Sequence, residues 1–172
     1  KDLDASSKEL IAAAAALNCT FREDDVVERA VSWAAENPDE ALGNDPEVVR
    51  RRVRHVHSET ARTISAVAAL KAGDIGRFGE LMNDSHVSLR DDYEIVPAAL
   101  ETAVRAAVGA GAIGSRITGG GFGGSIIALC PDDRTDAVAA AIEETTRAGG
   151  FPVPTIYATS AQDGARQVQL HL

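Results

Sequence analysis

The chain has 172 residues, a formal net charge of −9 from 17 basic and 26 acidic side chains, and 45% hydrophobic residues. These totals fit one globular unit, and the acidic balance argues against the electrostatic affinity for phosphate backbones that general nucleic-acid-binding proteins have. No uninterrupted apolar run approaches the roughly 20 residues that a membrane-spanning helix needs. We therefore expect neither a nucleic-acid partner nor a membrane partner.

The two cysteines, Cys19 and Cys130, lie far apart in the sequence. They are too few for a disulfide framework and lack the spacing of metal ligands. This usage favours a reducing compartment, so we expect a cytoplasmic protein. The first residue is Lys1 rather than Met, which indicates a piece of a longer protein.

Helical periodicity dominates the first 110 residues, with short apolar stripes over 10–17 and 27–34. Asp45-Pro46 is typical of an N-cap followed by a first-turn proline, and Gly73 is typical of a helix end, which together predict a helix of about 27 residues. Asp74 can cap the next helix, and a further helix is expected over 97–110. The apolar stripe of the long helix consists of Val49, Val53, Val56, Thr60, Ile64 and Val67.

The pattern changes at Gly109, after which strands are expected. Three short strands and one helix are predicted, the helix lying between the second and third strands. In chain order they are Arg116–Thr118, Ser125–Cys130, Asp136–Ala148 (the helix) and Pro154–Thr159. Helices followed by strand, loop, strand, helix and strand are typical of the α+β class. We expect one unit over residues 1–172, with a helical part over about 5–111 and a strand-containing part over about 112–160.

Glycine is concentrated between Gly109 and Gly124, which contain eight of the 15 glycines. The loop after the first predicted strand satisfies G-x-G-x-x-G, but a dinucleotide-binding site needs a helix directly after the loop, and a β-rich run follows instead. A protein-kinase loop needs a Lys on the following strand, and all three lysines precede the loop. A Walker A loop needs G-K-S or G-K-T, which the sequence lacks.

Two interpretations of this loop remain. Its glycines can turn successive backbone N–H groups toward an anion or another close ligand without obstruction by side chains. Alternatively, the loop is a hairpin connection, for which one or two glycines would be enough. Because five of the six residues from 119 to 124 are glycine, we favour a ligand.

The segment RITGGGFGG, Arg116–Gly124, resembles the third signature motif of the GHMP small-molecule kinases, in the version that galactokinases carry. Upstream, MNDSHVSLRDDYE from Met82 to Glu94 is similar to a segment of galactokinases. The run RHVHSETARTISAVAALKAGDIGRFG from Arg54 to Gly79 and the run TIYATSAQDGA from Thr155 fit the same family. The four segments occur in the family's order within residues 50–165.

The resemblance implies the C-terminal domain of a GHMP kinase, a ferredoxin-like antiparallel sheet with an additional helical region. It implies a full-length protein of galactose metabolism that transfers the γ-phosphoryl group of ATP to the anomeric hydroxyl of galactose, with Mg²⁺. Ser125 stands where many members have Cys. The loop that lines the active-site wall near the phosphates and the sugar would consist of Thr118, Gly119, Gly120, Gly121, Phe122, Gly123 and Gly124.

The family's other site elements have no counterpart in this sequence. Missing are the sugar-binding first motif, the Ser-rich phosphate loop, the Asp regarded as the catalytic base, and the Ser and Glu that hold the metal. The resemblance therefore implies that the N-terminal catalytic domain is absent and that this chain has no catalytic residue or metal ligand. ATP and Mg²⁺ would be bound mainly by the missing half, so this chain alone would be inactive.

The expected partner is the N-terminal half of the same protein, with galactose and ATP as substrates. The fourth strand of the family's sheet would precede Lys1, which predicts an exposed sheet edge and self-association of the isolated chain.

Two acidic residues and a potential triad lie near one predicted helix end. Ser85, His86 and Asp91 contain the residue types of a catalytic triad, but neighbours on a helix point about 100° apart, which favours a solvated or interface face. Asp91 and Asp92 oppose the helix dipole, which indicates a specific partner such as Arg90 or a backbone amide.

A basic cluster lies near the start of the long predicted helix: Arg50, Arg51, Arg52 and Arg54. Pairing with Asp45, Glu47 or Glu59 would make it a salt-bridged surface, and a phosphate or partner-domain role is the alternative. His55 and His57 diverge on a helix, so a shared metal site is not expected.

The leading hypothesis is the C-terminal domain of a galactokinase. One alternative is a stand-alone sugar-binding, nucleotide-binding or regulatory module that kept the loop. Another is the C-terminal half of a GHMP kinase for a different sugar, such as N-acetylgalactosamine or arabinose, because the residues that read the sugar lie mostly in the other half.

Overall fold

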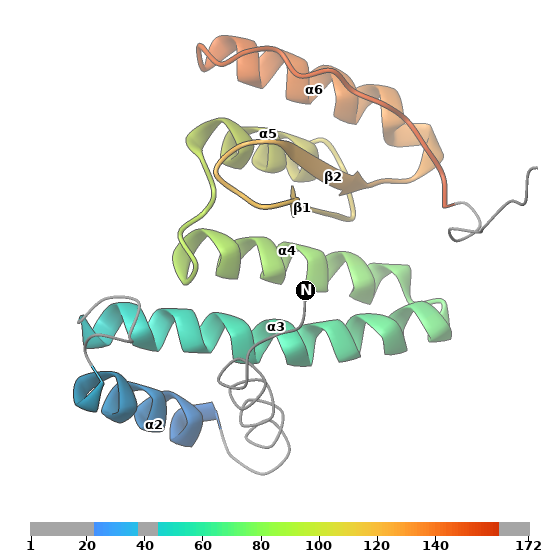
Figure 1. Ribbon diagram of the computed structural model, residues 1–172. Coiled ribbons are helices and arrows are strands. Elements are labelled where there is room, and N and C mark those ends of the chain that lie inside the picture. Colours follow the sequence, from blue (N-terminus) through green and yellow to red (C-terminus); the bar gives the residue numbers. More distant parts are fainter. Residues whose placement is uncertain (1–22, 38–44, 162–172) are drawn as a thin grey trace, which may run out of the picture.

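The computed structural model describes residues 23–37 and 45–161, which form four helices, a β-hairpin and a final helix (Figure 1). In chain order the elements are α2 (Glu23–Glu36), α3 (Pro46–Ala72), α4 (Ile75–Asp91), α5 (Ala98–Gly109), β1 (Gly114–Thr118), β2 (Ser125–Leu129), a 3₁₀ turn (Asp132–Arg134) and α6 (Thr135–Ala148). The predicted α+β class is confirmed. The helix predicted over 10–17 lies outside the described residues. None of the described helices is both long and apolar enough to cross a membrane.

Helix α3 begins and ends where its sequence signals predict. The Asp45 carboxylate accepts a hydrogen bond of 2.9 Å from the Glu47 backbone N–H, so it satisfies an amide that has no partner inside the helix. Gly73 ends the helix with a φ of 70°, and its N–H bonds back to the carbonyl of Leu70. Asp74 then caps α4 in the same way as Asp45 caps α3.

Three of the six residues of the apolar stripe predicted for α3 are exposed, namely Val56, Ile64 and Val67. Val56 is 61% exposed and Ile64 is 68% exposed, whereas His55 and Ala69, on a different face, are buried. Helix α3 turns this second face toward α4, because His55 and Glu59 on that face form hydrogen bonds with serines of α4. Periodicity located the apolar stripe correctly but did not identify the face that packs.

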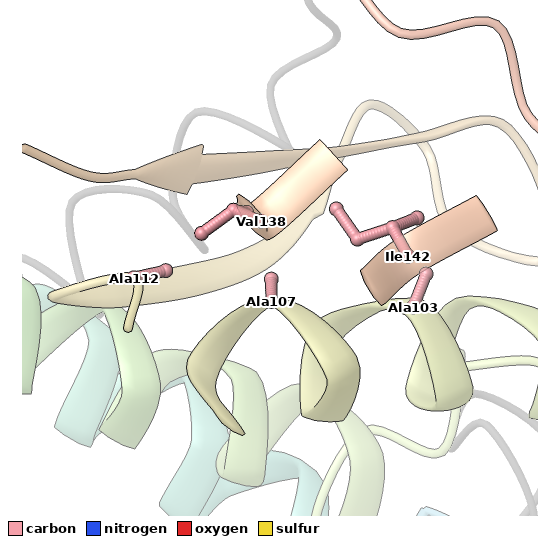
Figure 2. Close-up of a cluster of buried hydrophobic side chains, with 5 residues drawn as sticks. All are labelled: Ala103, Ala107, Ala112, Val138 and Ile142. Carbon is pink, nitrogen blue, oxygen red and sulfur yellow. The ribbon is translucent and has the colours of Figure 1, made fainter. Parts of the chain in front are cut away.

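The main hydrophobic cluster lies between α5 and α6 (Figure 2). Ala103 and Ala107 of α5 face Val138 and Ile142 of α6, with Ala112 beside them. Burying a Val or Ile side chain contributes roughly 1.5–3 kcal/mol, and the small alanines let the two helices approach each other. Side chains of β2 pack against the same cluster, so one face of the hairpin is covered by helices.

The hairpin is antiparallel, with Arg116 opposite Ile127 and Ile117 opposite Ile126. Alternation along β2 therefore places Ile126 on the helix-covered face and Ile127 on the other face, where it is 49% exposed. The strand predicted over 154–159 is wrong: the described part of the chain has a sheet of two strands, and residues 151–161 form no ladder. A strand needs a neighbouring backbone, and no described strand pairs with this segment.

Helix α4 covers the outer edge of β1 at very short range. A Cβ on Gly79 would lie 2.5 Å from the Ile113 side chain, and a Cβ on Gly114 would lie 2.4 Å from the Gly79 carbonyl oxygen. Asn83 completes the contact: its side-chain oxygen accepts from the Ser115 N–H at 2.9 Å, and its amide donates to the Ile113 carbonyl. The edge of β1 is thus bonded to a side chain of α4 in place of another strand.

Substitution at Gly79 tests this contact. We expect Gly79→Ala to lower the free energy of unfolding by about 1–3 kcal/mol, because two of the three nearest atoms are backbone atoms of Ile113, which cannot move aside as a side chain could. Gly76→Ala on the same helix is the matched control, since its nearest neighbour is 3.6 Å away, and it should be neutral or stabilising. Denaturant unfolding of both variants measures the difference, and equal effects would contradict the contact.

The other edge of the hairpin, along β2, pairs with no described strand. An unpaired strand edge is a template for pairing with another chain, which supports the expectation of self-association. Light scattering of the isolated chain should therefore show a mass that rises with concentration. Ile127→Lys should reduce the association, because an edge lysine opposes strand addition.

Ile64→Lys is the control, since it places the same charge on the exposed stripe of α3. If Ile64→Lys dissociated the chain and Ile127→Lys did not, the stripe and not the strand edge would be the interface. A monomer at every concentration would contradict the expectation altogether.

Candidate functional site

The glycine loop, Thr118–Gly124, joins β1 to β2 and is largely exposed. Its backbone has positive φ values at Gly119, Gly121, Gly123 and Gly124. Such a conformation is open to glycine and strained for other residues. The loop is therefore both a hairpin connection and a backbone whose shape depends on glycine, so the two interpretations of the sequence are compatible.

The loop is anchored on one side by the connection between α4 and α5. The Phe122 N–H donates to the Ile95 carbonyl at 2.9 Å, and a Cβ on Gly121 would lie 2.6 Å from the Ile95 side chain. Phe122 has a φ of 59° and its side chain is 78% exposed. On the other side, Gly119 and Gly120 have open space around them. The loop therefore exposes the backbone of Gly119 and Gly120 and the ring of Phe122, while Ile95 holds its middle.

Two loop glycines should differ in their tolerance of a methyl group. Gly121→Ala should lower the free energy of unfolding by about 1–3 kcal/mol, because it combines a φ of 78° with contact to Ile95. Gly120→Ala should change it by less than about 0.5 kcal/mol, since no atom lies within 4 Å of the added Cβ and the φ of Gly120 is outside the left-handed region. Thermal unfolding of the pair checks this, and equal losses would refute the anchoring of Gly121.

A cavity of about 470 Å³ lies beside the start of the loop, between α3, α4 and the open face of the hairpin. This volume is within the range of small-molecule sites, and most of the wall is apolar. The charged and hydroxyl-bearing residues of its wall are Glu59, Arg62, Thr63, Ser85, Arg116 and Thr118. The cavity therefore continues the surface of the glycine loop.

Glu59 is the centre of the polar wall of this cavity. Its carboxylate accepts a hydrogen bond of 2.6 Å from Ser85 Oγ and pairs with Arg62 on the same helix. Arg116 Nη1 lies 3.6 Å from Glu59 Oε2, so α3 is tied to β1 just before the loop. The sequence pattern did not predict this cluster. The spacing of Glu59 and Arg62 at i and i+3 was a readable signal, whereas the contacts to Ser85 and Arg116 join distant segments.

The three residue types of a triad do not come together. Ser85 bonds to Glu59, His86 Nε2 lies 2.9 Å from Glu101 Oε2, and Asp91 pairs with Arg90. The predicted partner of Asp91 is thus confirmed as Arg90. The hydrogen bond from Arg90 holds the pKa of Asp91 below its ordinary value. Ser85 and His86 therefore join α4 to other helices, Asp91 pairs within α4, and the three form no nucleophilic site.

His55 is buried between α3 and α4 and makes no metal site. Its ring stacks on Tyr93 with centroids 4.6 Å apart, and its Nδ1 lies 2.9 Å from Ser88 Oγ. Burial lowers the pKa of His55. Within the described ranges, no three His, Cys, Asp or Glu side chains are placed to hold a metal ion.

The basic cluster of α3 is a set of ion pairs, although most partners differ from those expected. Arg50 reaches Glu28 at 3.3 Å and the expected Glu47 at 3.9 Å. The other arginines reach across to the end of α4 and the residues that follow it. Arg51 Nη2 and Arg52 Nη2 lie 3.1 and 2.8 Å from Glu94 Oε2, and Arg54 Nη1 lies 3.1 Å from Asp92 Oδ1.

Comparison with known proteins gives two findings. Residues 66–148 match the family described as GHMP kinases C terminal. The chain is also similar to the crystal structure of Lactococcus lactis galactokinase complexed with galactose, with 31% sequence identity and a TM-score of 0.60. That similarity covers 78% of this chain, which spans 40% of the length of the solved protein.

Proposed function

We propose that this chain, which contains a galactokinase-like GHMP kinase C-terminal region, is the C-terminal half of a galactokinase. The full-length protein would transfer the γ-phosphoryl group of ATP to the anomeric hydroxyl of galactose. The observation that carries the proposal is the glycine loop. The backbone of Gly119 and Gly120 is open to a ligand, and the bond from Phe122 to Ile95 holds the loop in place, as the wall of a phosphoryl-transfer site requires. Phosphoryl transfer depends on positioning and on the stabilisation of charge, and backbone N–H groups contribute to both.

Thr118–Gly124 would face the phosphates and the sugar, with the open sides of Gly119 and Gly120 toward the substrates. ATP supplies the phosphoryl group, and Mg²⁺ would be held mainly by the N-terminal half. The choice of galactose over another sugar is supported by the galactose complex of the similar protein.

Activity measurements on the full-length protein and on the 172-residue chain test the proposal. We expect the full-length protein to phosphorylate galactose, and we expect the isolated chain to show no turnover. Galactose, N-acetylgalactosamine and arabinose should be compared under the same conditions. Turnover by the isolated chain at the full-length rate would contradict the division of labour, and a preference for another sugar would contradict the substrate.

A substitution in the loop links the activity to the proposed wall. In the full-length protein, Gly120→Ala should lower kcat/KM for galactose about tenfold or more, because small displacements of reacting groups are costly. No atom of this chain lies within 4 Å of the added methyl group, so a loss of activity would come from contact with the substrates or with the N-terminal half. Gly109→Ala also has open space but lies at the end of α5, and it should leave the activity unchanged.

A further inference from the structure

The connection between α4 and α5 lies between the arginines of α3 and the glycine loop. Glu94 accepts from Arg51 and Arg52, and the hydrogen bond from Arg52 is the larger cause of a pKa of Glu94 below its ordinary value. The next residue, Ile95, accepts from the Phe122 N–H of the loop at 2.9 Å. The two contacts are therefore one peptide unit apart.

Helix α3 holds this connection at several points. Arg52 also donates to the backbone carbonyl of Asp92 and lies over the Tyr93 ring, 5.7 Å from its centroid. Glu94 has a φ of 59°, a conformation that an ordinary side chain adopts only at a cost. Such a conformation persists when surrounding contacts determine it, and here the arginine pairs supply contacts at that residue.

Ile95 transmits the position of the connection to the loop. It is 8% exposed, and its N–H bonds to the Leu89 carbonyl at 3.1 Å. Its side chain fills the space beside Gly121, while its carbonyl fixes Phe122. A change of backbone angle at Glu94 would therefore displace a buried residue that contacts the loop in two ways.

We propose that Arg51 and Arg52 are positioning residues for the glycine loop, acting through Glu94 and Ile95. The inference deepens the proposed function, on which the loop's role in the reaction rests. Among the described residues, the hydrogen bonds of the two arginines go to Glu94 and the Asp92 carbonyl and not to the loop. Exposed ion pairs contribute little to global stability, so the expected effect is a local loosening of the loop.

Amide hydrogen exchange in the 172-residue chain measures this link without any substrate. In Arg52→Gln, the Phe122 amide should exchange about tenfold faster. The substitution removes the charged hydrogen bond to Glu94, and Glu94 positions Ile95, whose carbonyl accepts from the Phe122 amide. The Ser115 amide, bonded to Asn83 at the opposite end of β1, is the internal reference and should not change. Arg50→Gln is the matched control, because Arg50 pairs only with Glu28 and Glu47 in the described contacts.

Further variants separate geometry from charge. Arg52→Lys keeps the charge but loses the planar fork that reaches Glu94 and the Asp92 carbonyl together, so exchange at Phe122 should be intermediate. Glu94→Gly removes the carboxylate while permitting the positive φ, and it should also speed exchange at Phe122. Unchanged exchange in both Arg52→Gln and Glu94→Gly would overturn the proposal, as would equal acceleration at Phe122 and Ser115.

In the full-length protein the same variants connect the link to the reaction. Arg52→Gln should lower kcat about tenfold with little change in the thermal midpoint relative to Arg50→Gln. If the full-length protein had no sugar kinase activity, the proposed function would fail, while the exchange data would still decide whether the arginines position the loop. If exchange accelerated but kcat matched that of Arg50→Gln, the link to catalysis would be refuted.

Discussion

The close approach of α4 to β1 is the contact on which the rest of the structure depends. Gly79 and Gly114 leave no room for a Cβ, so the helix lies directly against the strand, and Asn83 bonds to the strand's outer edge. This fixes α4 beside the hairpin, and with it the position of the connection that leaves α4 at Asp92. The same contact protects one edge of a two-stranded sheet, which by itself would be only marginally stable.

Covering β1 with a helix makes the two sides of the hairpin unequal. One face packs on α5 and α6, and the other, with Arg116 and Ile127, borders the cavity beside the glycine loop. The edge of β2 has no described partner strand. Around the hairpin, the described residues leave open the β2 edge, the cavity and the outer side of the loop. This arrangement agrees with a chain that spans 40% of the galactokinase it resembles.

Several polar contacts join α3 to the elements that follow it. Glu59 links α3 to Ser85 and Arg116, and Arg51 and Arg52 link it to Glu94. The first set ends at Arg116, two residues before the glycine loop, and the second ends at Glu94, whose neighbour Ile95 contacts the loop. Ion pairs of this kind add little to the free energy of folding, but they restrict the geometry of the segments that they join. Helix α3 can therefore influence the geometry of the glycine loop from a distance, through Arg116 and Glu94.

The sequence by itself determined the helix ends, the hairpin and the glycine loop, because caps such as Asp45 and Gly73 and the spacing of apolar residues act locally. The family resemblance carried by Arg116–Gly124 was likewise available from the sequence. Only the tertiary structure decided which face of α3 packs, that residues 151–161 form no strand, and which carboxylates pair with Arg51 and Arg52. These outcomes depend on contacts between segments distant in the chain, and neither periodicity nor local propensity contains that information.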